Sequence, residues 1–301
     1  MIYCYHHDDL DGICSGSIVD RAFPTESKKF ISTTYPIDKD KILSTVKNVA
    51  GLTNIFFVDL SFGGNDKNFL VELSNVCAAR NIEITWIDHH EKSKLLIENW
   101  EDMPKSIFHR ISTSECGALG TYYYFNGEEL MYPIFLSLVD IWDRHVTTAS
   151  NWKNAIKFQF AMMSGDLTPQ SDVFVELMTG GKPILQYICD RGNIIWEYFK
   201  ENSRRLIESD GVITDVEGVE CLSLNYHGSS MVFDDVRNNF PLVMQWHYDG
   251  HLYYYSVYAG NENIDCNAIA SRYGGGGHIG AAGFSSDRLL FLPDKAVKYN
   301  K

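Results

Sequence analysis

The amino-acid sequence predicts an α/β protein in which a doubly wound parallel sheet forms the first domain and a linker helix leads to a smaller α/β domain. Two features predict this architecture. Short apolar segments alternate with helical patterns through the first third of the chain, as in parallel sheets with helices on both faces. The 301 residues also suffice for two domains of ~100–200 residues each. We expect the first domain at 1–182, the linker helix at 183–209 and the second domain at 210–301.

Strand and helix patterns alternate in the first domain. Apolar, β-branched and aromatic residues concentrate in the expected strands, which begin at residue 2 and continue at 29–35, 54–60, 84–87 and 106–111. Apolar residues at helical spacing predict helices at 12–23, 39–49, 66–80, 92–100 and 116–125. The segment 112–115 (Ser-Thr-Ser-Glu) resembles an N-cap for the last of these helices, although a hydroxyl group there could instead meet a phosphate.

The rest of the chain is mostly helical up to residue 209 and richer in strands beyond it. An apolar helix is expected at 131–141, and a long helix starts at Pro183, because proline is favoured in a first turn. Strands follow at 211–214, 219–225, 242–248 and 252–259, and then a short helix at 267–273. This change of pattern marks the second domain.

Charge and cysteine content narrow the class of protein. A formal net charge of -13 argues against a broad basic surface for long nucleic acid, but it allows a short phosphorylated ligand held by metal ions. The seven cysteines occur singly, without a CxxC pair, which indicates reduced thiols. No apolar run approaches the ~18 residues of a membrane span, and no leader pattern follows Met1. We therefore expect a soluble, cytoplasmic protein without a membrane partner.

Asp and His residues follow three of the predicted strands. The run 84–87 leads into Asp88, His89 and His90, the strand at 54–60 contains Asp59, and the first strand leads into the acidic segment 6–11. In open α/β sheets, ligands bind outside the carboxyl ends of the strands. An adjacent histidine pair can be a plain surface turn, but three strands that deliver Asp and His to one edge favour a metal site.

Side-chain direction selects among the candidate ligands. Along an extended segment, side chains alternate, so His7 and Asp9 should point to one side and His6 to the other. The helix at 131–141 leads to Asp140 and Asp143, which would share one helical side, and we expect Asp140 to be the ligand. The expected ligands are His7, Asp9, Asp11, Asp59, His89 and Asp140.

Four carboxylates and two imidazoles are too hard a donor set for a structural zinc site, and they suit manganese(II) best, with magnesium next. Two divalent metal ions that share a carboxylate would lower the pKa of a shared water and hold the attacking and leaving oxygens of a displacement at phosphorus. The expected reaction is hydrolysis of a phosphoester or phosphoanhydride. The chain has no Walker A or G-x-G-x-x-G motif for a nucleotide cofactor.

A glycine-rich segment lies near the end of the chain. Four glycines at 274–277 precede His278, and small residues follow. Such a segment lets the backbone approach an anion and present N–H groups as a phosphate nest, and a flexible loop is the alternative. The small residues after it favour tight packing.

Together these motifs resemble those of the DHH phosphoesterase family. The motifs are His7-x-Asp9-x-Asp11-Gly12, then Asp59, then the tripeptide Asp88-His89-His90, then Asp140, and the segment 275–283 (GGGHIGAAG) resembles the signature of the DHH-associated domain. The resemblance extends over nearly the whole chain. It implies two manganese ions in the first domain and a second domain that binds the nucleotide or phosphate end of the substrate. The first motif is most similar to the nano-RNase (oligoribonuclease) branch.

The resemblance also implies roles for individual residues. His89 is a metal ligand, and the expected catalytic residues are Asp88 and His90. The residues expected to contact substrate are Gly275, Gly276, Gly277 and His278. Relatives often carry a Ser-x-Arg element where this chain has Ser-Val-Tyr at 256–258. Either Arg272 or a residue such as Asn261 replaces the missing arginine, or the substrate terminus is held by weaker electrostatic interactions.

The expected function is that of a manganese-dependent phosphodiesterase acting on short oligonucleotides or small nucleotides. The alternatives are an adenosine bisphosphate phosphatase, a cyclic-dinucleotide phosphodiesterase and an inorganic pyrophosphatase. The tyrosine-rich strands of the second domain suit base stacking, although aromatic strands more often form core. A nucleotide-sensing module without hydrolysis would show eroded metal ligands, whereas every expected position is filled here.

Overall fold

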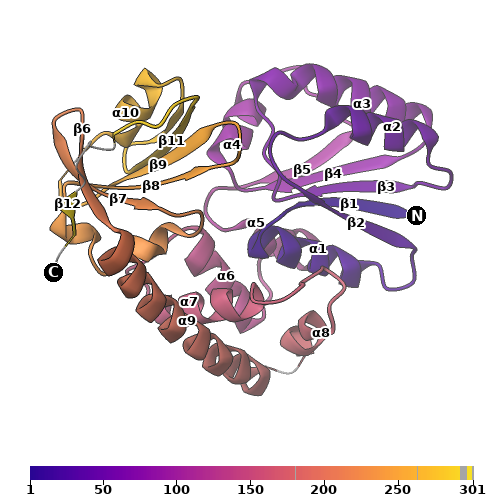
Figure 1. The fold of residues 1–301 in the computed structure, drawn as a ribbon. Helices are drawn as coiled ribbons and strands as arrows, with labels where there is room; N and C mark the ends of the chain where they lie inside the picture. Colours follow the sequence, from indigo (N-terminus) through magenta and orange to yellow (C-terminus); the bar gives the residue numbers. More distant parts are fainter. Residues whose placement is uncertain (180, 263, 292–296, 300–301) are drawn as a thin grey trace. The chain divides into compact units, whose positions relative to one another are not determined.

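The chain forms two compact units, Met1–Trp196 and Glu197–Lys301. The computed structural model describes residues 1–179, 181–262, 264–291 and 297–299. The boundary between the units falls inside one long helix, α9 (Lys182–Asp210), so the predicted linker helix contributes to both units (Figure 1). Residue 180 of the predicted first domain and residues 263, 292–296, 300 and 301 of the predicted second domain lie outside the described residues.

A five-stranded parallel sheet forms the centre of the first unit, and the predicted fold class is confirmed. The strand order is β2-β1-β3-β4-β5. The strands are β1 (Ile2–His7), β2 (Lys28–Thr33), β3 (Asn54–Val58), β4 (Glu83–Asp88) and β5 (Ile107–Ile111). Apolar residues on both faces of β1, β3 and β4 require cover on both sides, as doubly wound folds provide.

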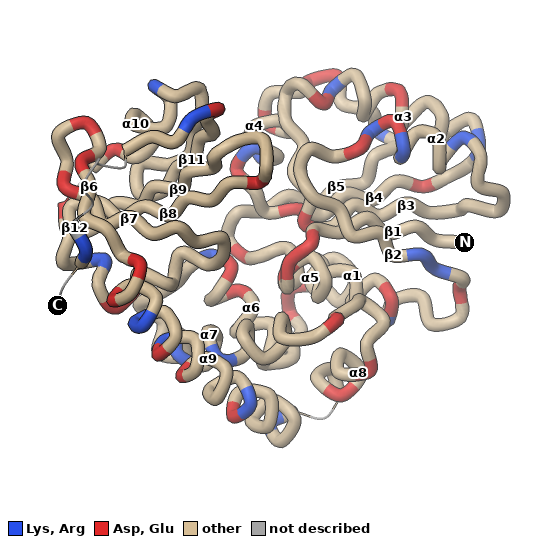
Figure 2. Tube along the Cα trace, viewed as in Figure 1, with Lys and Arg blue, Asp and Glu red and all other residues tan. Residues whose placement is uncertain are grey.

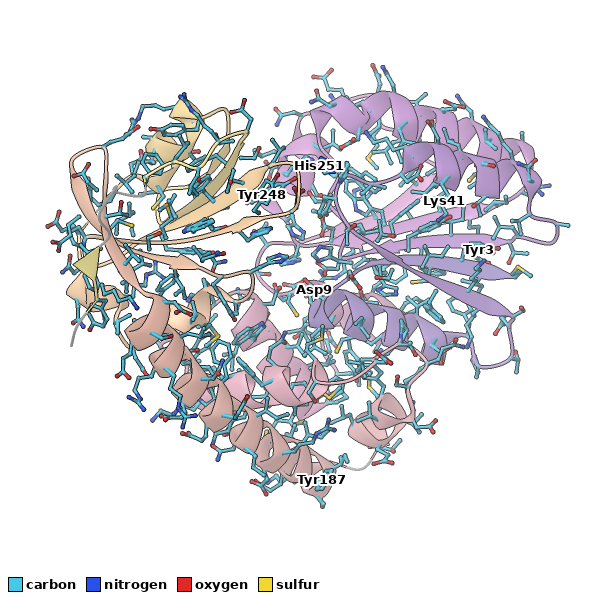
Figure 3. The ribbon with its side chains drawn as sticks, viewed as in Figure 1. Tyr3, Asp9, Lys41, Tyr187, Tyr248 and His251 are labelled. Atoms are coloured by element: carbon cyan, nitrogen blue, oxygen red, sulfur yellow. The ribbon has the colours of Figure 1, made fainter. Side chains whose placement is uncertain are left out.

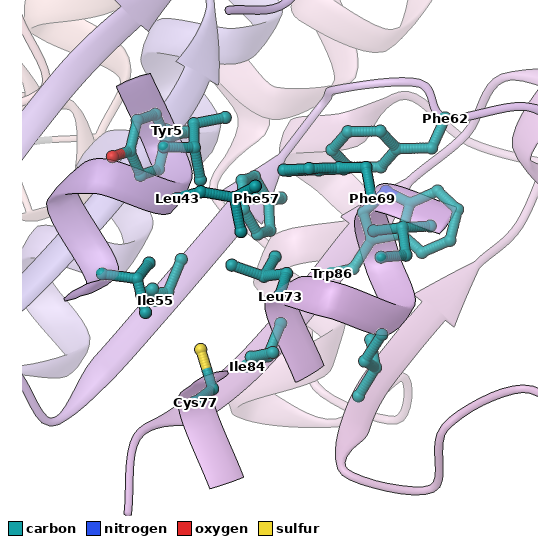
Figure 4. Close-up of a cluster of buried hydrophobic side chains, with 14 of the residues drawn as sticks. Tyr5, Leu43, Ile55, Phe57, Phe62, Phe69, Leu73, Cys77, Ile84 and Trp86 are labelled. Atoms are coloured by element: carbon teal, nitrogen blue, oxygen red, sulfur yellow. The ribbon is translucent and has the colours of Figure 1, made fainter. Parts of the chain in front are cut away.

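Helices cover the two faces of this sheet. One face packs against α2 (Lys39–Asn48), α3 (Lys67–Ala79) and α4 (Glu91–Glu98), where Phe57, Phe62 and Trp86 form an aromatic cluster (Figure 4). The short helix η1 (Gly64–Asp66) leads into α3. The other face packs against α1 (Leu10–Ala22) and α5 (Gly117–Asn126). The helix predicted at 12–23 begins earlier, because Asp9 caps it by accepting the Gly12 N–H.

A helical layer packs on α1 and α5 around a separate apolar cluster. It contains α6 (Ile134–Asp143), α7 (Trp152–Met162), α8 (Asp172–Thr179) and the first part of α9. The helix predicted at 131–141 starts later, with Pro133 at its N-cap position, and it ends later, at Asp143. No helix in the described ranges is both long and apolar enough to cross a membrane.

The second unit contains a mixed seven-stranded sheet with the order β10-β11-β9-β8-β7-β6-β12, in which β7 and β8 pair in parallel. The strands are β6 (Val212–Val216), β7 (Val219–Asn225), β8 (Leu242–Tyr248), β9 (Tyr253–Ala259), β10 (Gly276–His278), β11 (Ala281–Ser286) and β12 (Val297–Lys298). One face packs against α10 (Cys266–Arg272). The other face packs against Ile207 of α9, η2 (Ser230–Phe233) and the segment at η3 (Arg237–Asn239).

Candidate metal centre

The three strand ends that carry Asp and His meet at one edge of the first sheet. Because β1, β3 and β4 are adjacent and parallel, His7, Asp59 and the segment 88–90 leave the sheet on the same side. From β1, the chain adds β2 on one side and then β3, β4 and β5 on the other, so the direction of strand addition reverses between β1 and β3. Ligands of doubly wound sheets bind at such switch points. Figure 2 shows acidic residues along the segment from β1 into α1, where Figure 3 labels Asp9.

Asp59 lies at the middle of this cluster. Its side chain is 2% exposed, with Oδ2 3.9 Å from His7 Nδ1 and Oδ1 3.2 Å from His89 Nε2. Neither carboxylate oxygen has a hydrogen-bond partner among the described residues. The backbone of Asp59 has a φ of 55°, a strained conformation of the kind that clusters at functional sites. A buried carboxylate without donors is costly, and a cation would supply the missing interaction.

His7 and Asp9 lie on one side of Asp59. His7 Nδ1 is 2.7 Å from Asp9 Oδ2, while the other Asp9 oxygen caps α1 through the Gly12 N–H at 2.9 Å. Asp9 therefore combines the capping role with a position in the site. His6 lies on the opposite face of β1, buried, with its Nδ1 2.8 Å from the His7 carbonyl oxygen. The structure thus places His7, as expected, and not His6 beside Asp59.

A second group contains Asp11, His89 and Asp143. His89 Nε2 is 3.4 Å from Asp143 Oδ2 and 3.7 Å from Asp11 Oδ2. Oδ2 of Asp143 is buried and has no hydrogen-bond partner among the described residues. The position expected for Asp140 in this group is therefore occupied by Asp143.

Asp140, the expected ligand, has different partners. Its Oδ1 accepts the Cys116 N–H at 2.8 Å and the Nε–H of Arg144 at 2.9 Å. Asp140 and Asp143 lie nearly one turn apart on α6, so their spacing could not separate them. Asp140 is held by the Cys116 N–H at the start of α5, whereas Asp143 points toward His89 in the cluster.

The N-terminus of α5 holds the carboxylate of Asp11. The N–H groups of Gly117 and Ala118 donate to its two oxygens, each at 2.7 Å, as helix N-termini do for anions. The prediction that the segment 112–115 caps this helix is wrong. The hydroxyl groups of Ser112 and Ser114 donate to Glu115, which pairs with Arg110. Sequence reasoning missed this role of α5, because its donors are backbone groups.

Asp88 and His90 form a hydrogen-bonded pair beside the cluster. His90 Nδ1 lies 2.7 Å from Asp88 Oδ1, and the Ser93 hydroxyl donates to Asp88 Oδ2. The Asp88 side chain is fully buried and both of its oxygens are engaged, so it can orient the His90 ring. Burial lowers the pKa of His90, but the hydrogen bond to Asp88 and the nearby carboxylates outweigh this effect and raise it overall.

Burial and mutual repulsion shift the other titratable groups. The pKa values of Asp11 and Asp59 lie well above the ordinary value, because both groups are buried and face further carboxylates. Burial, with Asp9 nearby, raises the pKa of Asp143 to about 7. Burial and the neighbouring His90 lower the pKa of His89, which favours the neutral imidazole that a metal ligand requires.

These side chains fit hard divalent cations. Three groups have ligand atoms within 4.8 Å of one another: Asp59-Asp88-His89-His90, His7-Asp9-Asp59 and Asp11-His89-Asp143. The unsatisfied oxygens of Asp59 and Asp143 belong to these groups. Carboxylate and imidazole donors suit manganese or magnesium. When bound, such ions would lower the pKa of a water and neutralise charge on phosphoryl oxygens.

The glycine-rich segment of the second unit forms an edge hairpin. Gly276, Gly277 and His278 pair with β11, and the His278 side chain is exposed. The N–H groups of Gly275 and Gly277 donate to Ala270 O and Asn267 Oδ1, so they do not form the expected open nest. This corrects the nest prediction, because the backbone groups are already satisfied within the unit.

Arg272, expected to replace the missing arginine, lies in an ion pair. Arg272 is paired with Glu217, whose Oε1 accepts its Nε–H at 3.1 Å. Arg237 instead lies against Tyr258, the residue at the arginine position, with 5.9 Å between the guanidinium carbon and the ring centroid. Its Nε–H donates to Ala259 O at 2.6 Å. Arg237 lies in a loop remote in sequence, and no motif marks it.

Comparisons with known proteins identify the class of fold. No protein-family model matches the chain, and no curated protein matches it in sequence. A solved structure described as the DHH domain of a member of a family of ribosomal proteins is 16% identical, with a TM-score of 0.58 over 94% of this chain and 82% of that one. The prediction of a DHH fold is confirmed.

Two enzymes share the same fold. Exonuclease RecJ bound to manganese is 16% identical, with a TM-score of 0.52 over 95% of this chain and 86% of that one. The pGpG-specific phosphodiesterase PggH of Vibrio cholerae is 12% identical, with a TM-score of 0.51 over 95% of this chain and 93% of that one. Each match covers both units of the chain.

Proposed function

We propose that the chain is a DHH-family phosphoesterase that hydrolyses phosphodiester bonds of short oligonucleotides or small nucleotides with two divalent metal ions, manganese preferred. The position of Asp59 carries this proposal. Its unsatisfied carboxylate lies between His7 and His89, each of which belongs to a separate ligand group. A carboxylate shared by two ions is the central feature of two-metal phosphoryl chemistry.

The matched enzymes support the substrate class. RecJ is described as an exonuclease bound to manganese and PggH as a pGpG-specific phosphodiesterase, so proteins of this fold act on nucleotide phosphodiesters. We extend that class to this chain because its ligand groups supply the same kind of donors. The net charge of -13 favours a small substrate over long nucleic acid.

The proposed ligands are His7, Asp9, Asp11, Asp59, His89 and Asp143. Asp88 orients His90, and the raised pKa of His90 favours the protonated imidazole, which can donate a proton to the leaving oxygen. In the second unit, we propose that His278 and the edge strand at 276–278 contact the substrate. We propose Arg237, which lies against Tyr258, in place of Arg272 as the arginine that contacts the substrate.

A substrate panel tests the function. The full chain with manganese(II) is assayed on dinucleotides, longer RNA and DNA, cyclic dinucleotides, adenosine bisphosphate and pyrophosphate. We expect the highest kcat/KM on dinucleotides or other short oligonucleotides, and no turnover after chelation. Preferential turnover of adenosine bisphosphate or pyrophosphate would select a phosphatase instead, and binding without turnover of any substrate would select a sensor.

A further inference from the structure

Three aromatic rings stack on one face of the second unit's sheet. His227 and His247 are parallel, with ring centroids 3.9 Å apart and an interplanar angle of 11°. His247 and Tyr254 continue the stack at 5.2 Å and 14°. The rings come from three neighbouring segments: the residues after β7, the end of β8 and the start of β9. Figure 3 labels Tyr248 and His251 at the hairpin that joins the last two.

Hydrogen bonds fix this stack to the sheet. The Tyr226 N–H donates to Trp246 O at 2.9 Å, and the side-chain amide of Gln245 donates to Gly228 O at 3.0 Å. These two bonds hold the backbone on both sides of His227. Burial and the adjacent His227 lower the pKa of His247, so the central ring of the stack is neutral at neutral pH.

The stack has an open end beyond Tyr254. In the strand register, Tyr254 is opposite His247 on one side and Ser285 on the other, so Ser285 is the next residue along the row. Ser285 is small and exposed, and Tyr254 itself is 39% exposed. The neighbouring row on this face contains Gly276 and Gly283, which have no side chains. A planar ring placed over Ser285 would therefore continue the stack.

The neighbouring row also contains an unsatisfied polar group. Gln245 is opposite Ser256, which is opposite Gly283. Gln245 is 8% exposed, and its Oε1 is buried without a hydrogen-bond partner in the described part of the chain. Buried amide oxygens are normally satisfied, so this acceptor calls for a donor from a ligand or water. Exocyclic amino and ring N–H groups of nucleobases are such donors.

We propose that the face of Tyr254 above Ser285 is a nucleobase-stacking site, with the base continuing the His227–His247–Tyr254 stack. The site accepts purine bases best, because a larger ring covers more of the tyrosine. This inference rests on the proposed function for the identity of the substrate and deepens it, since it assigns base recognition to the second unit. The base contributes binding energy through a part of the substrate that does not itself react.

Calorimetric titration tests the site. The full chain in manganese(II) is titrated with AMP, GMP and ribose 5-phosphate, which shares the sugar phosphate but lacks the base. We expect AMP and GMP to bind about tenfold tighter than ribose 5-phosphate, which corresponds to about 1.4 kcal/mol from base stacking. Tyr254→Ala should remove this advantage, and Tyr254→Phe should keep it.

Two further variants test whether the effect is specific to the Tyr254 ring face. Ser285→Leu places a side chain over the open ring face and should remove the base advantage while Tyr254 stays in place. Tyr248→Ala is the matched control, because Tyr248 is on the same hairpin but on the opposite face of the sheet. Equal binding of AMP and ribose 5-phosphate by the unmodified chain would overturn the inference, as would an undiminished advantage in Tyr254→Ala or an equal loss in Tyr248→Ala.

Hydrolysis of bis-p-nitrophenyl phosphate by the unmodified chain is measured in parallel. A base advantage without any hydrolysis would overturn the proposed function and leave the stacking site supported. Hydrolysis without a base advantage would overturn the stacking site and leave the proposed function standing.

Discussion

Asp59 has two costly features, a buried carboxylate without a hydrogen-bond partner and a positive φ. Asparagine is one of the few residues that tolerates this backbone region, so Asp59→Asn removes the charge without adding backbone strain. Because loss of an outer partner of a metal ligand already costs ~10–100-fold, we expect Asp59→Asn to lower kcat by more than about 100-fold. Steady-state kinetics with manganese(II) measure this loss.

Thermal unfolding supplies the control for Asp59→Asn. In the metal-free state, the variant removes one of several crowded carboxylates, so its Tm should equal or exceed that of the unmodified chain. Manganese(II) should raise the Tm of the unmodified chain by binding the native state and should raise that of the variant much less. Near-normal turnover in Asp59→Asn would show that the site is misassigned.

Asp143 and Asp140 differ in their partners. Asp143 has an unsatisfied oxygen beside His89, whereas the oxygens of Asp140 are engaged by Cys116 and Arg144. We expect Asp143→Asn to weaken manganese binding by about tenfold or more. Asp140→Asn should chiefly lower stability, because it weakens the pairing with Arg144. Manganese titrations and unfolding curves of both variants give the comparison, and the reverse order would return the ligand role to Asp140.

At the scale of elements, the N-terminus of α5 positions the Asp11 carboxylate of the candidate metal centre. A Cβ atom on Gly117 would lie 2.8 Å from Asp59 Cβ and 3.0 Å from Asp11 Oδ2, closer than ordinary contacts allow. Gly117→Ala should therefore displace one of these carboxylates and weaken manganese binding by about tenfold or more. A competition titration with a chelator of known affinity measures the change.

Gly120, one turn further along α5, provides the matched control. A Cβ atom there would have its nearest neighbours at 3.7 Å or beyond, an ordinary contact distance. Alanine is favoured over glycine in a helix by ~1 kcal/mol, so Gly120→Ala should raise stability and leave manganese binding unchanged. If both substitutions weakened binding equally, the effect would belong to the helix as a whole and not to the contact with the site.

At the scale of the whole molecule, the carboxylate cluster should make the stability of the metal-free protein fall as pH rises. Asp143 has a pKa of about 7 in the folded chain against an ordinary value of 3.8, so the native state holds more protons than the unfolded state between these values. Stability then decreases with increasing pH across this interval. Denaturant unfolding of the chelated protein from about pH 4 to pH 7 measures the slope.

Bound manganese should remove this dependence. Metal ligands must be deprotonated, so metal affinity and the stability it adds increase with pH. Asp143→Asn should likewise flatten the profile of the chelated protein. Parallel profiles with and without manganese would mean that the cluster does not bind the metal.

The sequence by itself was enough to predict the parallel sheet, its flanking helices and the strand ends that form the site. The reason is local: apolar segments such as the one before Asp88 have a strand period, and the residues after them leave the sheet at a common edge. Alternation along β1 also predicted the positions of His6 and His7, because neighbouring side chains of a strand point to opposite faces.

Tertiary structure alone decided which side chains meet across elements. Asp140 and Asp143 share one side of α6, so the choice between them depended on the approach of the Cys116 N–H, which no periodicity encodes. Arg237 contacts Tyr258 from a separate loop, and Arg272 forms an ion pair with Glu217. The aromatic stack is assembled from His227, His247 and Tyr254 in three segments. Such contacts depend on how segments remote in sequence pack together, whereas a sequence pattern reports only the period of each segment by itself.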